Sequence, residues 1–419
     1  MSVNSVTRYF AKQLNTLLLV YDKNTQGLSS GSGHRKRAVM SQVTLKIGFI
    51  GAGAIHFGRP EVPWDHASRL EKIGGIEVIG IVDPDTCRSD QVLKERLASS
   101  VHGHMYTHCR LLTDYTELLG MRPDVVFIGS PPGYRGSPKS GRNPELEFAQ
   151  AGIHVFVEKP LSVVPPEEFS PYARAVAEAC RTNNVVISVG YKFRYHPAVL
   201  KMKELIAQHG GKVMAFNARY YLAYTEGINK YWFNSDISGG PVIEQATHFC
   251  DIARYIAGEI DMTSLHTLML NDSDKGGAGK LNHVLNNAED DLPPSKRIPR
   301  VTLSHWRFEG GGLGTLMHSL TLPGSRYHVT FDVQLDGLQF SLIDPYESIS
   351  ILRVRSLEGG NPNRDQDFVF ENDMYLRELD LFIQAVRQGK QSLIKSSYED
   401  ALKTYELTWA IRRQGEVKN

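Results

Sequence analysis

The sequence predicts an α/β protein in which a parallel sheet is followed by a second, mostly antiparallel sheet. Two observations support this prediction. Between residues 45 and 189, short apolar runs alternate with helical stretches, which is typical of βαβ units and of a parallel sheet covered on both faces. After about residue 210, longer runs follow one another across glycine-containing turns, which indicates antiparallel hairpins.

The first half of the chain is expected to hold five strands. Leu45–Ile50 is short and apolar enough for a buried strand, and the later runs have the same character. Helical stretches separate the runs; the longest, Pro166–Arg181, carries small and apolar residues on one face. The expected strands are 45–50, 76–82, 124–130, 154–157 and 185–189.

The second half is expected to form its own sheet. Strands are predicted at 213–222, 301–308, 313–322, 327–335 and 338–343. The turns at 309–312, 323–324 and 336–337 predict hairpins, and Asp336-Gly337 is a strong turn signal. Residues 271–300 are polar and contain adjacent acids and adjacent prolines, so we expect an exposed and mobile loop insertion there.

Two helices are expected at the end of the chain. One runs from Asp373 to about Gln388 and stops at Gly389. The other begins at Ser396, because Glu399 three residues later completes a capping-box pattern.

Residues 1–43 are expected to be a leader outside the fold. Residues 1–40 contain six Lys or Arg and a single acid, Asp22, so a disordered tail and a mitochondrial transit peptide both fit. The whole chain holds 47 basic and 46 acidic residues, which gives no reason to expect a nucleic-acid or membrane-surface partner. No apolar run approaches the roughly 20 residues of a membrane span. Four widely spaced cysteines favour a reducing compartment, so we expect a cytoplasmic location.

A glycine turn follows the first expected strand. Gly51 and Gly53 match the first two glycines of a dinucleotide-binding turn, which brings backbone N–H groups toward a pyrophosphate at a helix N-terminus. The third glycine position holds His56. Asp83 ends the second strand, where a carboxylate binds ribose hydroxyls. Asp83 favours NAD whereas Arg88 can meet the 2′-phosphate of NADP, so both coenzymes remain open; an ordinary α/β turn without a ligand is the alternative.

Glu158 and Lys159 stand directly after the expected strand 154–157, at the edge where open α/β sheets bind ligands. A lysine in apolar surroundings can have a lowered pKa and take part in proton transfer. For this pair alone, a surface ion pair at a strand end is the alternative interpretation.

Glu244 and His248 are four residues apart in a helical stretch that two glycines introduce, so we expect them to share one helical face. A carboxylate near an imidazole raises the pKa of the imidazole and orients it, which suits a general acid and base. A structural Glu–His contact is the alternative for this pair alone. Asp251 follows, either as a supporting group or as a charge on the helix surface.

Two other clusters have more than one interpretation. The aromatic residues between 220 and 232 either line a sugar-sized pocket or pack within the sheet. The histidines and the cysteine between 102 and 109 are metal-ligand types, but they have no acidic partner and no ligand motif, so we predict no metal site. These residues are Tyr220, Tyr221, Tyr224, Tyr231 and Trp232, and His102, His104, His108 and Cys109.

Several motifs together resemble those of the Gfo/Idh/MocA family, the glucose–fructose oxidoreductase and inositol dehydrogenase family of nicotinamide-dependent enzymes. They are Gly51-x-Gly53, Asp83-Pro84, Ser130-Pro131-Pro132, Glu158-Lys159-Pro160 and the run from Gly190 to Pro197. The resemblance extends from about residue 44 to the C-terminus, and Glu-Lys-Pro is its most specific motif. The segment 239–251 is similar to the family's Gly-Gly-…-Asp-x-x-x-His motif, with Glu244 in place of the usual Asp.

The resemblance implies a Rossmann domain, residues 44–192, and an α/β domain, residues 193–372, with a large open-faced sheet that often makes oligomer contacts. Residues 373–419 are expected to pack back on the Rossmann domain. The implied activity is hydride transfer between NAD or NADP and a CH–OH or carbonyl carbon of a sugar, cyclitol or related polyol. A homodimer or homotetramer and a frequently cis Lys159–Pro160 bond are implied as well.

The resemblance also assigns site residues. Lys159 and His248 are the implied catalytic groups, one as the base and the other polarising the oxygen, and Glu244 orients His248. Substrate contacts are expected from Lys192, Arg194, Tyr221 and Trp232. Two positions depart from the family pattern: Lys192 stands where Asn is common, and Arg135 stands where His is common. Coenzyme contacts are expected from Gly51, Gly53, Ala54, Ile55, Asp83, Arg88, Ser130, Pro131, Glu158 and Lys159.

Two alternatives remain open at this point. One is a nucleotide-sensing regulator that keeps the coenzyme site and has lost catalysis. The other is a reductase or dehydrogenase of non-carbohydrate ketones or diols that uses the same residues.

Overall fold

The computed structural model describes residues 43–59, 65–136, 143–223, 230–284, 289–324, 326–357, 361 and 363–417. The expected leader lies outside these residues, apart from Val43. In the part of the chain that the structure describes, no helix has both the length and the apolar character needed to cross a membrane.

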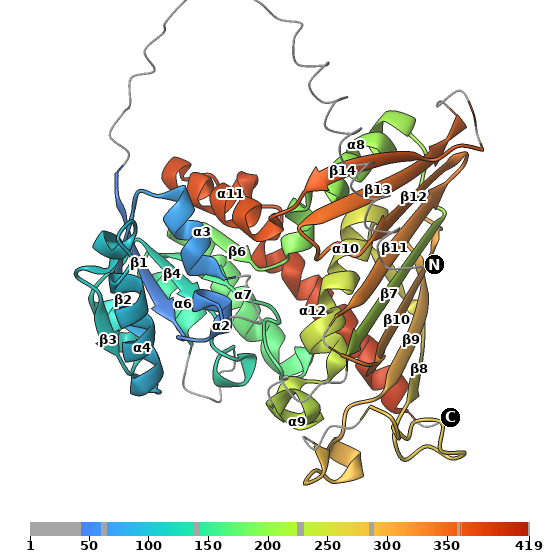
Figure 1. Cartoon of the computed structure of the whole chain (residues 1–419), viewed down its shortest axis with the longest axis horizontal. Helices are drawn as coiled ribbons and strands as arrows, with labels where there is room; N and C mark the ends of the chain where they lie inside the picture. Colours follow the sequence, from blue (N-terminus) through green and yellow to red (C-terminus); the bar gives the residue numbers. More distant parts are fainter. Residues whose placement is uncertain are drawn as a thin grey trace, which may run out of the picture. The chain divides into compact units, whose positions relative to one another are not determined.

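Six parallel strands form the first sheet, in the order β3-β2-β1-β4-β5-β6 (Figure 1). The strands are β1 (Leu45–Ile50), β2 (Ile76–Val82), β3 (Arg110–Leu112), β4 (Val125–Ile128), β5 (His154–Val157) and β6 (Ile187–Val189). The five expected strands are present. The sequence did not predict β3, because only one of its three residues, Leu112, is buried. The order of the strands reverses between β1 and β4, because β2 and β3 are added on one side of β1 and β4 to β6 on the other. In open α/β sheets, ligands bind outside the carboxyl ends of the strands at such a point.

Helices cover both faces of the first sheet. Because successive strand residues point to opposite faces, Phe127 and Phe156 face one layer while Val126 and Val155 face the other. Phe382 packs against Phe127 and Phe156, with ring centres 5.8 and 5.4 Å apart, so a helix from the end of the chain completes this layer. The first layer holds α3 (His66–Ile73), α4 (Thr86–Leu97) and α11 (Met374–Gln388); the second holds α5 (Tyr115–Gly120), α6 (Pro144–Gln150), α7 (Pro166–Thr182) and α12 (Tyr398–Glu416).

Eight strands form the second sheet, in the order β14-β13-β12-β11-β7-β10-β9-β8. They are β7 (Ala215–Ala223), β8 (Ile260–Leu270), β9 (Val301–Phe308), β10 (Leu313–Leu322), β11 (His328–Leu335), β12 (Leu338–Ile343), β13 (Ile349–Ser356) and β14 (Gln366–Glu371). All neighbours pair antiparallel except β7 and β10, which are parallel.

The hairpins predicted at 309–312 and 336–337 are confirmed, since β9 pairs with β10 and β11 pairs with β12. The hairpin predicted at Pro323-Gly324 is wrong. There β7, from much earlier in the chain, inserts between β10 and β11 and pairs with both. A Pro-Gly signal shows that the chain reverses but does not show whether another strand enters the gap.

One face of the second sheet is covered by α8 (Pro197–His209), α10 (Thr247–Ala257) and α12. α12 also contacts α7 and β6, so it lies between the two sheets (Figure 1). The other face carries large exposed apolar side chains, which agrees with the open-faced sheet that the resemblance implied. These include Leu268, Leu303, Ile343, Ile349, Ile351 and Val369.

The loop insertion at 271–300 is only partly as expected. Its described residues contain no strand. They include a short helical turn, η8 (Pro294–Lys296). The prediction that the whole loop is exposed is wrong, because Glu289 and Arg300 are both buried and form an ion pair at 2.6 Å. A second ion pair of the same length joins Arg297 to Asp272. All four residues lie within the segment, so these pairs join its parts to one another.

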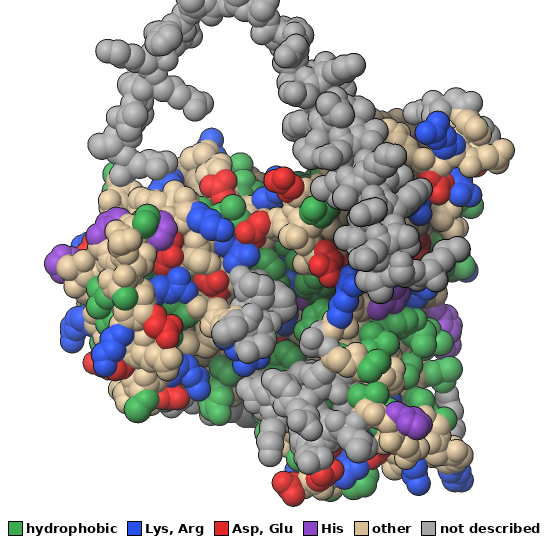
Figure 2. Space-filling model, in the orientation of Figure 1, with side chains coloured by type: hydrophobic (Ala, Val, Ile, Leu, Met, Phe, Trp, Pro, Cys, Tyr) green, Lys and Arg blue, Asp and Glu red, His purple; other side chains and the backbone are tan. Residues whose placement is uncertain are grey.

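The final helix begins one residue later than predicted. Ser397 is the N-cap of α12 and accepts a hydrogen bond from the backbone N–H of Asp400 at 3.3 Å. Ser396 is buried and donates instead to the carbonyl of Val189 at 2.7 Å. Ser396 therefore attaches the start of α12 to the first sheet. On the face shown in Figure 2, basic and acidic side chains of the described residues are interspersed.

Candidate active site

Gly51 and Gly53 connect β1 to the short helix α2 (Ala54–Phe57). Gly51 has φ +106°, a conformation that glycine adopts readily, and a Cβ added there would lie 3.3 Å from the backbone nitrogen of Ser130. A Cβ added at Gly53 would meet no described atom within 4 Å. The turn therefore leaves its backbone open where the pyrophosphate of a nicotinamide coenzyme would be held. Ala54 and Ile55 begin α2, and Ser130 and Pro131 follow β4 at the same edge of the sheet.

Asp83 fixes this turn from the end of β2. Its Oδ2 accepts a hydrogen bond from Ala52 N–H at 2.7 Å, and its Oδ1 accepts one from Asp85 N–H at 2.8 Å. A carboxylate has further lone pairs for ribose hydroxyls. Arg88 is largely exposed and forms an ion pair with Asp85 at 3.2 Å. The edge of the coenzyme site thus carries two acids and one arginine.

His56 stands where a third glycine is usual, and its side chain is buried under the turn. Its Nδ1 lies 2.7 Å from the carbonyl oxygen of Gly51. Burial lowers the pKa of His56 to about 3, so the ring is neutral, and Nδ1 donates because a carbonyl only accepts. The imidazole therefore holds the turn in place through this hydrogen bond. The sequence analysis noted only that a glycine is missing at this position and did not predict this role.

Arg135 is a buried side chain that organises the Glu-Lys-Pro turn. It donates to the carboxylate of Glu145 at 3.0 Å, and Glu145 accepts a second hydrogen bond from Tyr172. It also donates to four backbone carbonyls, those of Ser130, Glu158, Pro160 and Leu161. The Lys159–Pro160 peptide bond inside this turn is cis, as the resemblance implied. The sequence marked Arg135 as a departure from the family but did not predict this role.

Glu158 is buried beneath the turn and pairs with a histidine that the sequence analysis did not single out. Its Oε1 lies 3.1 Å from Nε2 of His66, at the start of α3. Burial raises the pKa of Glu158, but the His66 hydrogen bond and the charges of Lys159 and Lys192 bring it below its usual value. Glu158 is therefore an ionised acid beside two lysines.

Lys159 reaches from the first sheet to the helix that carries Glu244. Its Nζ donates to the carbonyl oxygen of Glu244 at 2.8 Å and lies 3.4 Å from the Glu244 Oε1. Burial raises the pKa of Glu244, and the charge of Lys159 opposes that rise without cancelling it. The other carboxylate oxygen, Oε2, is buried and has no partner among the described residues.

His248 is buried between the rings of Tyr191 and Phe193. Its Nε2 lies 3.1 Å from the Nζ of Lys192, and its Nδ1 has no hydrogen-bond partner in the described part of the chain. Burial and the charges of Lys192 and Lys159 lower the pKa of His248 well below its usual value. The ring is therefore neutral at physiological pH.

The contacts differ from the expectation that Glu244 orients His248. Glu244 lies in a π-helical turn, Val242–Ala246, that precedes α10. A π turn is wider than an α turn, so residues four apart no longer lie directly above one another. Glu244 contacts Lys159, and His248 contacts Lys192.

Lys192 belongs to the helical turn η4 (Lys192–Tyr195) that follows β6. Its Nζ lies 5.0 Å from the ring centre of Tyr346 and 4.7 Å from that of Tyr375. Burial and the neighbouring Lys159 lower the pKa of Lys192 to about 7, although Glu158 and Glu378 oppose this shift.

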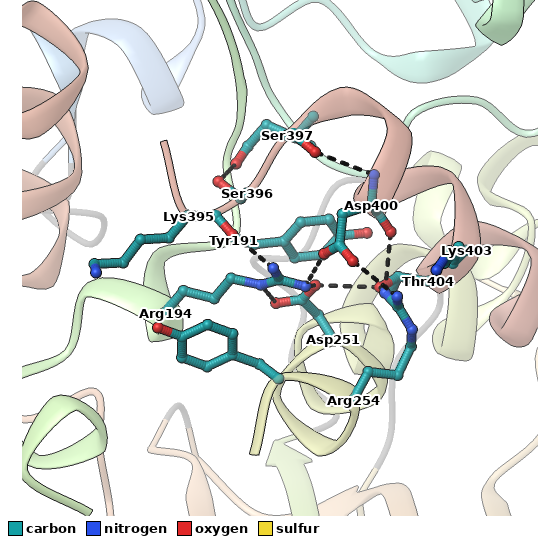
Figure 3. Close-up of polar contacts among 12 residues, drawn as sticks. Tyr191, Arg194, Asp251, Arg254, Lys395, Ser396, Ser397, Asp400, Lys403 and Thr404 are labelled. Atoms are coloured by element: carbon teal, nitrogen blue, oxygen red, sulfur yellow. Dashed lines mark hydrogen bonds and ion pairs between the residues drawn. The ribbon is translucent and has the colours of Figure 1, made fainter. Parts of the chain in front are cut away.

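Arg194 is not available for a substrate contact of the kind expected. It is buried and donates two hydrogen bonds to Asp251, at 2.8 and 2.6 Å, and it also pairs with Asp400 (Figure 3). Arg254 pairs with Asp400 at 2.9 Å and with Glu259 at 2.8 Å. Asp251 is thus a buried part of a charge network that joins η4, α10 and α12.

The expected aromatic contacts are distributed over both faces of the second sheet. Tyr221 donates to the sulfur of Met317 at 3.4 Å, whereas its neighbour Tyr220 points to the covered face and stacks on Phe249 at 4.7 Å. Trp232 is half-buried in η5 (Lys230–Phe233). Tyr224 and the side chain of Tyr231 lie outside the described residues. Among the residues described, no three His, Cys, Asp or Glu side chains are grouped to hold a metal ion.

Comparisons with known proteins identify the family of the chain. Residues 45–191 match a family model described as "Oxidoreductase family, NAD-binding Rossmann fold", and residues 194–338 match an oxidoreductase C-terminal domain. The chain is 36% identical over 384 residues to the uncharacterised protein UNK4.17 of Schizosaccharomyces pombe, covering 88% of this chain and 90% of that protein. It is 26% identical over 335 residues to scyllo-inositol 2-dehydrogenase (NAD(+)) of Bacillus subtilis, covering 78% and 84%.

Among solved structures, levoglucosan dehydrogenase in complex with NADH has the same fold, with a TM-score of 0.68 at 16% identity over 88% of this chain and 96% of that one. The family models and the relatives define a nicotinamide-dependent oxidoreductase. The chain belongs to the Gfo/Idh/MocA family and is an NAD(P)-dependent dehydrogenase or reductase.

Proposed function

We propose that the protein transfers a hydride between NAD or NADP and a CH–OH or carbonyl carbon of a sugar, cyclitol or related polyol. The observation that carries the proposal is the convergence of Lys159, from the first sheet, with His248, from the helix covering the second. Lys159 donates a hydrogen bond to the carbonyl oxygen of Glu244 at 2.8 Å, and the turn that holds Glu244 leads directly into α10, which carries His248. The bound coenzyme supplies the hydride acceptor or donor.

The protein's side chains carry out the steps of the proposed reaction other than the hydride transfer. An alcohol carbon becomes a carbonyl only if its hydroxyl proton also leaves, so a proton acceptor is required. His248 is neutral, and its Nδ1 has no partner within the described part of the chain, which suits this role. The Lys159 ammonium polarises the substrate oxygen and stabilises its developing negative charge. Glu244 holds Lys159 in place.

The substrate class rests on the relatives and on the residues around Lys192. The similar proteins include a levoglucosan dehydrogenase and a scyllo-inositol 2-dehydrogenase. Tyr346 and Tyr375 present ring faces near Lys192, and aromatic faces beside charged groups suit the apolar and polar sides of a sugar ring.

The decisive experiment is nicotinamide-absorbance screening of the purified protein against sugars and cyclitols with both coenzymes. The proposal is supported if the protein turns over at least one polyol. In Lys159→Ala and in His248→Ala, this turnover should fall by orders of magnitude while coenzyme binding persists. Coenzyme binding without turnover would favour a nucleotide-sensing regulator. Turnover confined to non-carbohydrate ketones or diols would favour the other alternative.

Further parts of the proposal follow from the same structure. NAD is favoured over NADP, because Asp83 and Asp85 would repel a 2′-phosphate beside Arg88.

The exposed apolar face of the second sheet supports a homo-oligomer. The four free cysteines support a reducing, cytoplasmic location. We take residues 44–192 and 193–372 as the two domains, and the packing of Phe382 supports the return of the last helices to the first. Kinetics with both coenzymes and the mass of the particle in solution test the first two parts.

A further inference from the structure

Lys192 is a buried lysine to which the proposed reaction assigns no task. Its side chain is 8% exposed, and lysine is rarely so buried unless it is paired with an acid. Here its hydrogen-bond partner is an imidazole, with Nζ 3.1 Å from Nε2 of His248. A lysine in this setting can exchange a proton with the ring that it contacts.

Titratable groups face Lys192 from several elements. Two aromatic rings favour its charged form, and Glu158 supplies a negative charge. Lys159 and burial disfavour the charged form of Lys192. Burial raises the pKa of Glu378 well above its usual value, which favours the uncharged acid and weakens it as a counter-charge. The facing groups are Glu158 and Lys159 after β5, His248 in α10, Tyr346 before β13, and Tyr375 and Glu378 in α11.

His248 itself is poorly suited to keep a proton. It is buried beside two lysines, so an imidazolium would face both desolvation and like charge. Its two nitrogens are nevertheless in different situations: Nε2 contacts Lys192, while Nδ1 is buried and lacks a partner among the described residues. This is the arrangement of a general base supported by a third group, with an amine where a carboxylate is usual.

We propose that Lys192 is a positioning residue that receives, through His248, the proton released by the substrate hydroxyl. The inference rests on the proposed function and adds the destination of the proton. During oxidation the substrate O–H bond breaks and an Nδ1–H bond forms, while the Nε2–H bond breaks and an Nζ–H bond forms. The carbon loses its hydride to the coenzyme, and the neutral amine of Lys192 becomes an ammonium. His248 is neutral before and after, and reduction runs the same transfers in reverse.

The pKa of about 7 agrees with this role, because an appreciable fraction of Lys192 is then the uncharged amine at neutral pH. The relay resets when the ammonium releases its proton and the original imidazole tautomer forms again.

The kinetic test compares Lys192→Arg, Lys192→Met and a control. Arginine keeps the charge but cannot accept a proton, so we expect kcat to fall about 100-fold or more while NADH affinity stays within about twofold. Methionine removes the charge beside His248, so we expect partial activity. The pH-rate limb near 7 that we expect for the wild type should be lost in this variant. The control is Lys203→Arg, another partly buried lysine, which lies over the ring of Tyr255 and should leave kcat unchanged.

A second test does not depend on turnover. In the full-length protein labelled with nitrogen-15 in histidine, and with His248→Asn to assign the signal, we expect the His248 ring to stay neutral between pH 6 and 8. Its tautomer signal should change with a midpoint near 7, and Lys192→Met should abolish that change. A ring that itself takes up a proton near its ordinary pKa of about 6.5 would overturn the inference.

The two proposals fail separately. Wild-type turnover on a polyol that Lys192→Arg retains would overturn the proton route and leave the proposed function intact. A wild-type protein that binds NADH and turns over no substrate would overturn the proposed function, while the labelling experiment would still decide whether Lys192 and His248 exchange a proton.

Discussion

Two buried charge clusters in this protein are built from the same two elements and differ in how completely their charges are matched. η4 and α10 bring Lys192 to His248, and on the same elements they bring Arg194 to Asp251. In the Arg194 cluster each acid has a guanidinium partner, as Figure 3 shows for Asp251 and Asp400. In the Lys192 cluster a lysine contacts an imidazole, and Nδ1 of His248 has no partner among the described residues.

The comparison indicates what each cluster is for. A buried ion pair whose groups are all matched holds elements in one arrangement, and removing one member exposes the other to the full cost of burial. A buried polar atom without a partner is uncommon in native proteins, and a ligand or a reacting group is one of the ways in which its bonding is completed. We therefore infer that the matched cluster positions η4 and α10, and that the unmatched cluster takes part in the proposed chemistry.

The largest effect is expected for Lys159→Met, which removes the ammonium and keeps most of the side-chain volume. We expect kcat to fall by about 1000-fold or more, because both the polarising charge and the contact with Glu244 are lost. NADH binding, followed by fluorescence, should remain within a few-fold of the wild type. A variant with more than a tenth of wild-type turnover would remove Lys159 from the chemistry and weaken the contrast between the clusters.

The next effect is on stability and concerns the matched cluster. Arg194→Met leaves the Asp251 carboxylate buried without its main partner, so we expect a loss of about 3–5 kcal/mol in the free energy of unfolding. Urea unfolding followed by circular dichroism measures this loss. As a control, Lys203→Met removes a lysine near the same network that makes no ion pair with Asp251, and it should cost far less. A loss below about 1 kcal/mol for Arg194→Met would mean that the network does not hold the two elements together.

Glu244→Gln should have a moderate effect. The amide keeps a hydrogen-bond acceptor for Lys159 but removes the charge, and we expect kcat/KM to fall about tenfold, or ~1.4 kcal/mol. Burial raises the pKa of Glu244, so the wild type should lose activity as the pH falls through that raised value and Glu244 takes up a proton. The pH-rate profile of Glu244→Gln should lack this acidic limb. If the limb persists unchanged in the variant, another acid is responsible.

The smallest effect is expected at the rim of the matched cluster. The Glu259 side chain is 40% exposed, so Glu259→Gln should cost about 0.2–1 kcal/mol of stability at pH 7. Arg254 lowers the pKa of Glu259 in the folded protein, so its contribution is present above the unfolded pKa of about 4.3 and is lost as the pH falls through the folded value. Urea unfolding of both proteins at pH 7 and at pH 3.5 should show the difference shrinking in acid. A constant difference would contradict the linkage.

Much of the fold follows from local patterns. The apolar runs predict five of the six strands of the first sheet, and Gly51-x-Gly53 predicts the turn after β1, because strand formation and glycine conformation depend mainly on neighbouring residues. The insertion of β7 between β10 and β11 was not predictable in this way, since it pairs segments about 100 residues apart. The sequence likewise pointed to Lys159 and His248 as candidates and missed His66, which meets Glu158 only in the folded chain.

Five strands of each sheet, the glycine turn and the candidates Lys159 and His248 were thus predicted from the sequence alone, through residue type and spacing, whereas β3, β8, β13 and β14 were not. The tertiary structure decided which groups meet: Lys159 with Glu244, Lys192 with His248, and Arg194 with Asp251. The physical reason is that a side chain's partner, and so its protonation state, depends on the burial and charge that distant segments bring around it. Spacing along one helix cannot convey that, and the π turn at Glu244 changed even the spacing.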